Sequence, residues 1–312
     1  MSLAFLFPGQ GSQSVGMGEA VWEAFPVARE VFEEVDDALN QKLSAIMFNG
    51  PLEDLTLTAN TQPALMACSI AVARTLDREF GIPVTAAGFV AGHSLGEYSA
   101  LCAAGSLGLA DTARLLKLRG EAMQQAVPVG KGAMAALLGA SIEDAQALCD
   151  SVEGVAEIAN DNATGQVVIS GEASAIEAAA SKAGDLGIKK AVMLPVSAPF
   201  HCSLMQPAAD AMRDALSDVV LRAPAVAVVN NVRAEPVVDP ETLKADLVAQ
   251  VTGRVRWRES VLWMAENGVE ATAELGTGKV LTQMTRRIAK GVAGVALSTP
   301  DDLEAFANTM KG

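Results

Sequence analysis

The sequence predicts an α/β protein with a hydrolase-like large subdomain, built on a mostly parallel sheet, and an inserted ferredoxin-like (βαββαβ) small subdomain. An unbroken apolar run opens the chain, which is typical of a strand buried on both faces. Strand and helix patterns then alternate up to residue 128, as in layered α/β proteins. Between residues 130 and 198 the order becomes β-α-β-β-α-β, the split arrangement of ferredoxin-like units.

The large subdomain is expected over residues 1–128 and 199–312, and the small one over residues 129–198. The first strand, Leu3–Phe7, ends at the break formed by Pro8-Gly9. The other elements expected before residue 129 are helices at Ala20–Leu39, Gln62–Phe80 and Glu97–Ala104, a strand at Ala87–Ala91, and a helix from an Asp111 cap to about Val127.

The small subdomain follows from the same patterns. Its expected strands are Ala133–Leu138, Ala156–Asn160, Gln166–Ser170 and Ile188–Val196, and its expected helices are Ile142–Asp150 and Ala173–Leu186. After this insertion the large subdomain resumes. The elements expected there are a helix at Leu204–Leu216 and strands at Ala225–Asn230 and Thr272–Leu275.

The hydrophobic content of the chain indicates a folded protein, and its negative net charge argues against anionic partners. Hydrophobic residues make up 50% of the 312 positions, which is enough for a sizeable core. The 37 acidic residues outnumber the 23 basic ones and give a net charge of −14. Nucleic acid and anionic membrane surfaces bind proteins through basic residues. We therefore expect neither as a partner.

Further features bear on location and on metals. No apolar run long enough for a membrane span is present, and the N-terminus lacks the basic start and apolar stretch of a signal peptide. The cysteines, Cys68, Cys102, Cys149 and Cys202, show no CxxC spacing. That pattern suits the reducing cytosol and argues against disulfides and zinc. We expect a cytoplasmic protein without a metal and, since heptads and repeats are absent from the sequence, a monomer.

A candidate nucleophile lies in Gly92-His93-Ser94-Leu95-Gly96, which matches G-x-S-x-G between an expected strand and an expected helix. Side chains two residues before or after the serine would collide with the adjoining strand and helix. The turn exposes the hydroxyl of Ser94 at a helix N-terminus, where the N–H of Leu95 faces a developing oxyanion. The alternative interpretation is a glycine-rich turn with an incidental serine.

A serine nucleophile needs a general base, and the chain has only two histidines. His93 adjoins Ser94, but neighbouring side chains at a tight turn diverge, so His93 is a poor base. His201 follows Pro199-Phe200 where the small subdomain returns to the large one, a place suited to lining a cleft. A histidine beside a phenylalanine is often simply packed. With a nucleophile turn present and no other candidate, His201 is the expected base.

An arginine interrupts an apolar helix stripe. The stripe is formed by Thr112, Leu116, Met123 and Val127, and Arg119 falls inside it. Arginine enters an apolar face where an anion or several acceptors meet it. The functional interpretation is a bidentate clamp for a substrate carboxylate. The alternative is a snorkelling or structurally paired arginine.

Together these motifs resemble the malonyl-CoA:acyl carrier protein transacylase family, over essentially the whole chain. The family's opening signature is matched by Phe7-Pro8-Gly9-Gln10-Gly11, and its nucleophile turn by residues 92–96. Further matches follow in the family's order and at similar spacing, namely Arg119, Ser197-x-Pro199-Phe200-His201, Gln250 and Gly276-x-Gly278-Lys279-Val280-Leu281. One departure is Thr277, where relatives often carry proline.

The resemblance implies that the chain transfers malonyl from malonyl-CoA to the phosphopantetheine thiol of acyl carrier protein. The implied mechanism is ping-pong, through a serine acyl-enzyme, with no cofactor. Ser94 would carry the acyl group and His201 would act as base, oriented by the backbone carbonyl near Gln250. The backbone N–H groups of Gln10 and Leu95 would form the oxyanion hole.

The resemblance also implies how the substrate is held. Arg119 would bind the free malonyl carboxylate. Leu95 and Phe200 match members that use malonyl rather than methyl-branched units. We also expect Met123, from the apolar stripe, and His93, beside the nucleophile, to contribute to substrate binding. Whether the product feeds fatty acid or polyketide synthesis is not indicated by the sequence.

Two other functions are left open. A serine hydrolase such as a thioesterase would share Ser94 and His201, but it gives no reason for Arg119 in the stripe or for the inserted subdomain. An inactive module that binds carrier proteins would not need these three side chains intact. The candidates for docking a carrier protein are two basic clusters, Arg286 with Arg287 and Lys290, and Lys189 with Lys190.

Overall fold

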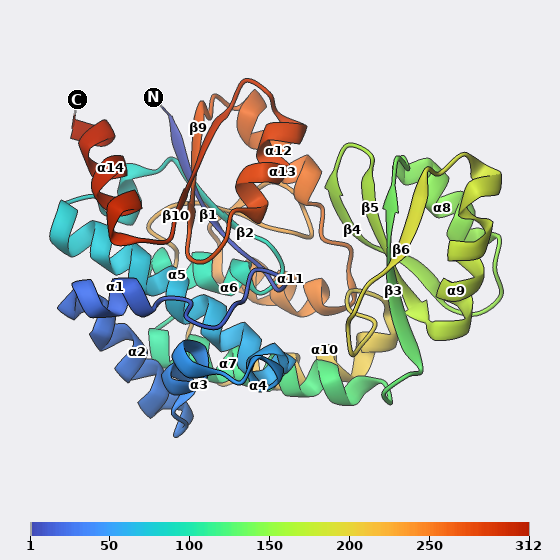
Figure 1. Ribbon diagram of the computed structural model, residues 1–312, viewed down its shortest axis with the longest axis horizontal. Coiled ribbons are helices and arrows are strands. Elements are labelled where there is room, and N and C mark those ends of the chain that lie inside the picture. The colour runs from blue at the N-terminus through green and yellow to red at the C-terminus, as the bar shows by residue number, and fades with distance from the viewer. Residues whose placement is uncertain (1, 312) are drawn as a thin grey trace.

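The computed structural model describes residues 2–311 of the 312-residue chain. Its helices and strands form two bodies, each with a sheet of its own (Figure 1). The larger body holds both ends of the chain, and the smaller one is drawn in green and yellow on the right of Figure 1. The predicted α/β class, with a mostly parallel sheet and a separate small subdomain, is confirmed.

The larger sheet has six strands in the order β10-β9-β1-β2-β7-β8. The strand bounds are β1 Leu3–Phe7, β2 Phe89–Gly92, β7 Val228–Val229, β8 Pro236–Val237, β9 Ala271–Leu275 and β10 Ala293–Leu297. Neighbouring strands from β10 to β7 are parallel, and β8 pairs with β7 antiparallel. Because β1 and β2 run in the same direction, their carboxyl ends meet at one edge of the sheet.

β1 is buried on both faces, as its unbroken apolar run predicts. Phe5 and Phe7 belong to the main core of the large subdomain. Ala4 and Leu6 belong to a second core on the opposite face. Successive residues of a strand point to opposite faces, so one strand serves both cores. The strand is therefore held between two packed layers, and the loop that follows it has a fixed starting point.

Helices cover both faces of this sheet (Figure 1). The main core receives side chains from α2, α5, α6, α7 and α10, and the second core from α12 and α13. The helix bounds are α1 Glu19–Ala24, α2 Pro26–Leu39, α3 Leu43–Asn49, α4 Leu52–Thr56, α5 Thr58–Phe80, α6 Gly96–Ala103, α7 Leu109–Ala126, α10 Gln206–Ser217, α11 Pro240–Thr252, α12 Trp257–Glu266, α13 Val280–Ile288 and α14 Pro300–Lys311. Within residues 2–311, none of the helices combines the length and apolar character needed to span a bilayer.

Some predicted helix bounds in the large subdomain are wrong. The helix predicted at Gln62–Phe80 begins four residues earlier, at Thr58. The helix predicted at Ala20–Leu39 is two helices, because Phe25 is extended (φ −128°, ψ 120°) and Pro26 begins α2. Proline suits the first position of a helix but lacks the N–H needed in its interior. The helix predicted to be capped by Asp111 begins at Leu109 instead. Asp111 lies in its first turn, where a negative charge suits the helix dipole.

The smaller sheet has four antiparallel strands in the order β4-β5-β3-β6. Its elements are β3 Gly132–Leu138, α8 Ile142–Asp150, β4 Ala156–Ala163, β5 Gln166–Glu172, α9 Ala173–Lys182 and β6 Lys190–Met193. This is the predicted ferredoxin-like order, in which each helix connects two strands with a third between them. The second helix is shorter than predicted, because Ala183–Leu186 forms a 3₁₀ turn. All six elements fall within residues 129–198, and we propose that range as the extent of the subdomain.

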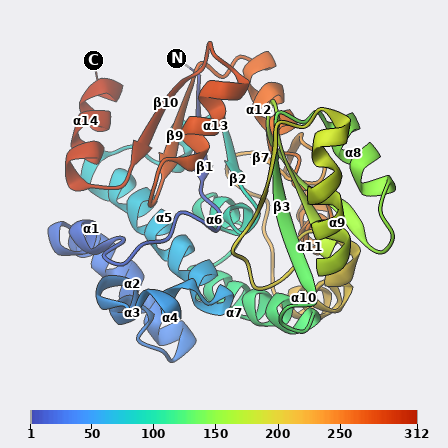
Figure 2. The same cartoon turned by 45° about the vertical axis from the view of Figure 1, so that its right-hand side comes forward.

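α8 and α9 cover only the outer face of the small sheet (Figure 2). Val167 and Ile169 of β5 belong to the core beneath these helices. Val168 points the other way and, with Met134 of β3, lines the cavity described below. This alternation follows from the pleat of a strand. The small subdomain therefore presents its uncovered face to the large one.

β4 joins the small sheet to the segment that leads into α12. The N–H of Val255 donates to the carbonyl of Ala159 at 2.8 Å, and the N–H of Asp161 donates to the carbonyl of Val255 at 2.9 Å. Arg258, at the start of α12, pairs with the buried carboxylate of Asp161 at 2.8 Å. These contacts fix the edge of the small sheet that faces the cavity.

Candidate active site

A cavity of about 360 Å³ lies beyond the carboxyl ends of β1 and β2, between the two subdomains. This is where ligands bind in open α/β sheets. Its walls come from the loop after β1, the turn after β2, α7, α13, the small sheet and the segment around residue 200. The predicted site residues that line it are Gln10, His93, Ser94, Leu95, Arg119, Met123, Phe200 and His201. Gln250, on α11, lies buried behind them.

The turn that carries Ser94 needs a glycine on each side. A Cβ on Gly92 would lie 1.9 Å from the carbonyl carbon of Gly96, and a Cβ on Gly96 would lie 2.1 Å from the carbonyl oxygen of Phe7. Ser94 itself has a φ of 53°, which residues with side chains rarely adopt. Asn231 holds the turn, since its Oδ1 accepts the N–H of Ser94 and its Nδ2 donates to the carbonyl of Gly92, both at 2.7 Å.

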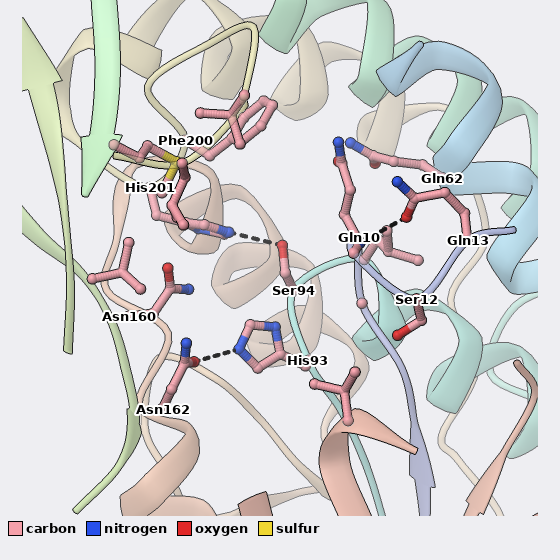
Figure 3. A pocket seen from close by; sticks show the side chains of 18 of the residues that line it. Gln10, Ser12, Gln13, Gln62, His93, Ser94, Asn160, Asn162, Phe200 and His201 are labelled. Carbon is pink, nitrogen blue, oxygen red and sulfur yellow. Dashed lines mark hydrogen bonds between the residues drawn. The ribbon is translucent and has the colours of Figure 1, made fainter. Parts of the chain in front are cut away.

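The hydroxyl of Ser94 faces the imidazole of His201, with Oγ and Nε2 separated by 2.8 Å (Figure 3). The other ring nitrogen, Nδ1, lies 2.9 Å from the backbone carbonyl oxygen of Gln250. Because a carbonyl oxygen only accepts, we infer that Nδ1 carries the proton and Nε2 is free to take one from Oγ. His201 has a φ of 59°. Such strained backbone concentrates at functional sites.

Burial keeps this imidazole neutral. His201 is 4% exposed, and burial together with the positive charge of Arg119 lowers its pKa to about 3. A neutral ring with a free Nε2 is the form that accepts a proton. A carboxylate bound to Arg119 would offset the positive charge of the guanidinium. The pKa of His201 would then rise, and its imidazole would become a stronger base.

Arg119 is 1% exposed within the otherwise apolar stripe of α7. Its guanidinium donates to the Oε1 atoms of Gln62 at 2.9 Å and Gln250 at 3.0 Å, and to Oγ of Ser94 at 3.2 Å. None of the ion pairs formed within residues 2–311 includes it. A buried cation held by neutral acceptors keeps its charge for an anionic ligand. This geometry favours the clamp over a structurally ion-paired arginine.

Gln10 and Leu95, the residues predicted to form the oxyanion hole, line the same cavity as Ser94. Gln10 belongs to the loop after β1, and Leu95 precedes α6. Neither N–H donates to an acceptor in the described part of the chain. The loop and the turn approach closely only because residue 9 is a glycine, since a Cβ on Gly9 would lie 2.7 Å from the carbonyl oxygen of His93. N–H groups free to donate beside a nucleophile suit a developing oxyanion.

The ring of His93 is held by the small subdomain rather than by the nucleophile. Its Nε2 lies 2.8 Å from Oδ1 of Asn162 in β4 (Figure 3), and it packs edge-on against Trp257 with ring centroids 5.6 Å apart. Burial lowers its pKa. His93 thus forms cavity wall, as the divergence of neighbours at a tight turn predicts. Phe200 and Met123, both buried, form other parts of the wall.

Several polar residues at this site have no counterpart in the sequence prediction. They are Gln62 on α5, Glu97 on α6, Asn160 and Asn162 on β4, and Asn231 after β7. All are buried. A polar side chain in a buried segment is unfavourable unless it is hydrogen-bonded. Glu97 in a helix of small residues and the Asn230-Asn231 pair after a strand are the signals that point to them.

Residues 2–311 contain no group of three or more His, Cys, Asp or Glu arranged to hold a metal ion. All four cysteines are free. Cys202, the neighbour of His201, is buried, and burial raises the pKa of its thiol to about 11. A thiol with so little thiolate is a packing residue rather than a competing nucleophile.

Residues 4–301 match the family model described as acyl transferase domain, which gives the class of protein. A relative from Bacillus subtilis (strain 168), named malonyl CoA-acyl carrier protein transacylase, is 43% identical over 99% of this chain and 97% of its own. The crystal structure of acyl-carrier-protein-S-malonyltransferase from Bartonella henselae is 55% identical, with a TM-score of 0.97 over 100% of both chains. The chain therefore belongs to the malonyl-CoA:acyl carrier protein transacylase family.

A further solved structure shows a relative with its partner. It is described as a type II PKS acyl-carrier protein in complex with its malonyl-transacylase. The match is 40% identical, with a TM-score of 0.96, and covers 99% of this chain and 100% of the other. Binding of an acyl carrier protein is thus a property of a close structural neighbour.

Proposed function

We propose that the chain transfers a malonyl group from malonyl-CoA to the phosphopantetheine thiol of an acyl carrier protein, through a malonyl ester of Ser94. The observation that carries the proposal is the 2.8 Å contact between Oγ of Ser94 and Nε2 of His201, beside the buried guanidinium of Arg119. Family membership supports the same reaction. The product would supply fatty acid or polyketide chain extension.

In the first half-reaction, Oγ of Ser94 attacks the thioester carbonyl while Nε2 of His201 takes the hydroxyl proton. The backbone carbonyl of Gln250 holds the ring in the required orientation. The tetrahedral oxyanion accepts hydrogen bonds from the N–H groups of Gln10 and Leu95. Its collapse breaks the C–S bond, and the imidazolium returns the proton to sulfur. Coenzyme A leaves as the thiol, and the malonyl group remains as an ester.

In the second half-reaction, the carrier thiol enters the same cavity. His201 takes the thiol proton, and the thiolate attacks the malonyl ester of Ser94. Collapse of the intermediate breaks the bond to Oγ, which regains the proton from His201. These steps balance without a change of redox state, and we propose that neither a metal nor another cofactor takes part. Water must be kept from the ester, because it would turn the enzyme into a hydrolase.

Selection of the malonyl group is assigned to Arg119. Its guanidinium contacts Oγ of Ser94 at 3.2 Å, so a carboxylate paired with it lies near the reacting atoms. Two parallel N–H···O bonds suit the planar carboxylate. Phe200 and Met123 contribute apolar wall around the acyl chain. An acetyl group brings no carboxylate and leaves this buried cation without an anionic partner.

The carrier protein is proposed to dock over α13. Val280, Leu281 and Met284 of this helix line the cavity, and its last turn carries Arg286 and Arg287. The chain has a net charge of −14, so an acidic partner can dock only at a local basic patch.

The second basic cluster, Lys189 with Lys190, lies at β6 on the edge of the small sheet. It is the alternative docking surface. We propose a cytoplasmic monomer, and the four free cysteines support the reducing compartment.

A transfer assay with purified holo carrier protein and malonyl, methylmalonyl and acetyl donors tests the proposal. We expect malonyl carrier protein to form fastest and the acetyl product at least about tenfold more slowly, because one charge-assisted contact is lost. Release of free malonate at the same rate with and without carrier protein would instead indicate a serine hydrolase. Binding of the carrier without any product would indicate an inactive module.

A further inference from the structure

Behind the Ser94 turn lies a buried carboxyl that the proposed mechanism does not use. Glu97, in the first turn of α6, is 0% exposed. Its Oε2 accepts the backbone N–H of Asn231 at 2.8 Å and the side-chain Nε2 of Gln250 at 3.1 Å. Its Oε1 has no hydrogen-bond partner within residues 2–311. A half-satisfied buried carboxyl is unfavourable for stability, so its presence points to a role in function.

Gln250 connects this carboxyl to the reacting groups. Its Nε2 also donates to the carbonyl of Ser94 at 3.0 Å, and its Oε1 accepts from Arg119 at 3.0 Å. Its backbone carbonyl is the acceptor for Nδ1 of His201 at 2.9 Å. The hydrogen bond from Gln250 to Glu97 therefore fixes the side-chain amide of Gln250, which contacts both the Ser94 turn and the guanidinium of Arg119. The same residue orients His201 through its backbone carbonyl.

Asn231 gives Glu97 a second connection to the nucleophile. The backbone N–H of Asn231 is held by Glu97, while its side chain binds the N–H of Ser94 and the carbonyl of Gly92. Both hydrogen bonds of that side chain are 2.7 Å long. Loss of the Glu97 contact would free the backbone that positions this amide.

The hydrogen-bond partners of the His201 ring are neutral, a serine hydroxyl and a backbone carbonyl. An imidazolium formed in a buried site is stabilised by a negative charge nearby. The positive charge of Arg119 disfavours the imidazolium, and the charges of Glu97 and Arg119 interact. We propose that Glu97 is a positioning residue of the transfer reaction, whose carboxylate holds Gln250 and Asn231 in place and offsets the charge of Arg119. The inference rests on the proposed function.

The charge of Glu97 changes within an accessible pH range. Burial raises its pKa to about 7, against the hydrogen bonds that it accepts. The charge of Asp246 on α11 raises the pKa further, and the charge of Arg119 on α7 lowers it. The carboxylate therefore forms as pH rises through about 7, and the rate of acylation rises with it. In the free enzyme the pKa of His201, about 3, lies well below this range. An inflection that belongs to Glu97 is lost in a variant without this carboxyl, whereas one that belongs to His201 remains.

The test is the single-turnover rate of acylation by saturating radiolabelled malonyl-CoA between about pH 6 and 9, in wild type and in Glu97→Gln. The substitution keeps the shape of the side chain and its acceptor oxygen but removes the charge. We expect the wild-type rate to rise about tenfold from about pH 6 to 8. In Glu97→Gln we expect no inflection, a rate at least about tenfold lower at about pH 8, and a KM for malonyl-CoA within about twofold of wild type.

Asp36→Asn is the matched control, since Asp36 is a buried carboxyl on α2 that is bound to Ser44 and lies outside the cavity. It should keep the wild-type pH profile. A persistent inflection in Glu97→Gln, or a rate within about twofold of wild type, overturns the proposal. A wild-type rate that is constant over this pH range also overturns the proposal. That measurement does not depend on the folding of any variant. Absence of acylation in wild type overturns the proposed function, and this inference with it.

Discussion

The guanidinium of Arg119 donates a hydrogen bond to Oγ of Ser94 at 3.2 Å, and the same oxygen lies 2.8 Å from Nε2 of His201. A hydroxyl oxygen that accepts from a cation is a weaker nucleophile than one that is free. A carboxylate bound to Arg119 would draw the guanidinium from this oxygen and weaken its lowering effect on the pKa of His201. The arrangement links acylation to a carboxylate on the acyl group.

Arg119→Ala is expected to slow malonyl transfer about 10- to 100-fold, because it removes charge-assisted hydrogen bonds worth about 1.5–3 kcal/mol. Acetyl transfer should be retained or become faster. The measurement is the initial rate with malonyl-CoA and with acetyl-CoA as donor. Arg114→Ala, an exposed arginine on the same helix, is the control and should change neither rate. An equal loss with both donors would mean that Arg119 is structural.

The lowered pKa of His201 has a consequence for stability. The unfolded chain protonates this histidine near its ordinary value of 6.5, whereas the folded protein does so only near 3. Acid between these values therefore favours the unfolded state. Through this residue, the free energy of unfolding of wild type should fall by about 2 kcal/mol from pH 7 to pH 5. His201→Gln lacks the imidazole and should not show this loss. Urea unfolding at both pH values measures it, and an unchanged difference between the two proteins would contradict a buried, neutral imidazole.

Gly96→Ala should destabilise the protein by about 3 kcal/mol or more, or displace the Ser94 turn, because the new Cβ would meet the carbonyl oxygen of Phe7 at 2.1 Å. Urea unfolding and the reactivity of Ser94 toward a fluorophosphonate probe report the two effects. Gly184→Ala is the matched control, since a Cβ there meets no atom within 4 Å. If both variants behave like wild type, the steric account of the turn is wrong.

The fold could be predicted where periodicity is long and undisturbed. β1 and α8 have the bounds that their patterns predict, and the ferredoxin-like order follows from six regular elements. The strand predicted at Ala225–Asn230 shrinks to Val228–Val229, and its partner Pro236–Val237 also has two residues, too few to show an alternating pattern. Helices α11 to α14 lie in the part of the chain where the pattern predicts only the strand Thr272–Leu275.

The site could be predicted in part, for a physical reason. Ser94 and Arg119 stand out locally, one by its flanking glycines and the other as a cation in an apolar stripe. Asn231 and the side chain of Gln250 gain their roles only through contacts with Ser94 that span 137 and 156 residues. Spacing along the chain carries no information about such contacts.

A malonyl ester on Ser94 is tested most directly by the mass of the intact protein after mixing with malonyl-CoA, followed by peptide mapping of the added group. The wild-type chain should gain one malonyl group on Ser94 and lose it when holo carrier protein is added. Ser94→Ala should gain none. Stoichiometric labelling that persists in Ser94→Ala, or a malonyl group mapped to another residue, would contradict the account.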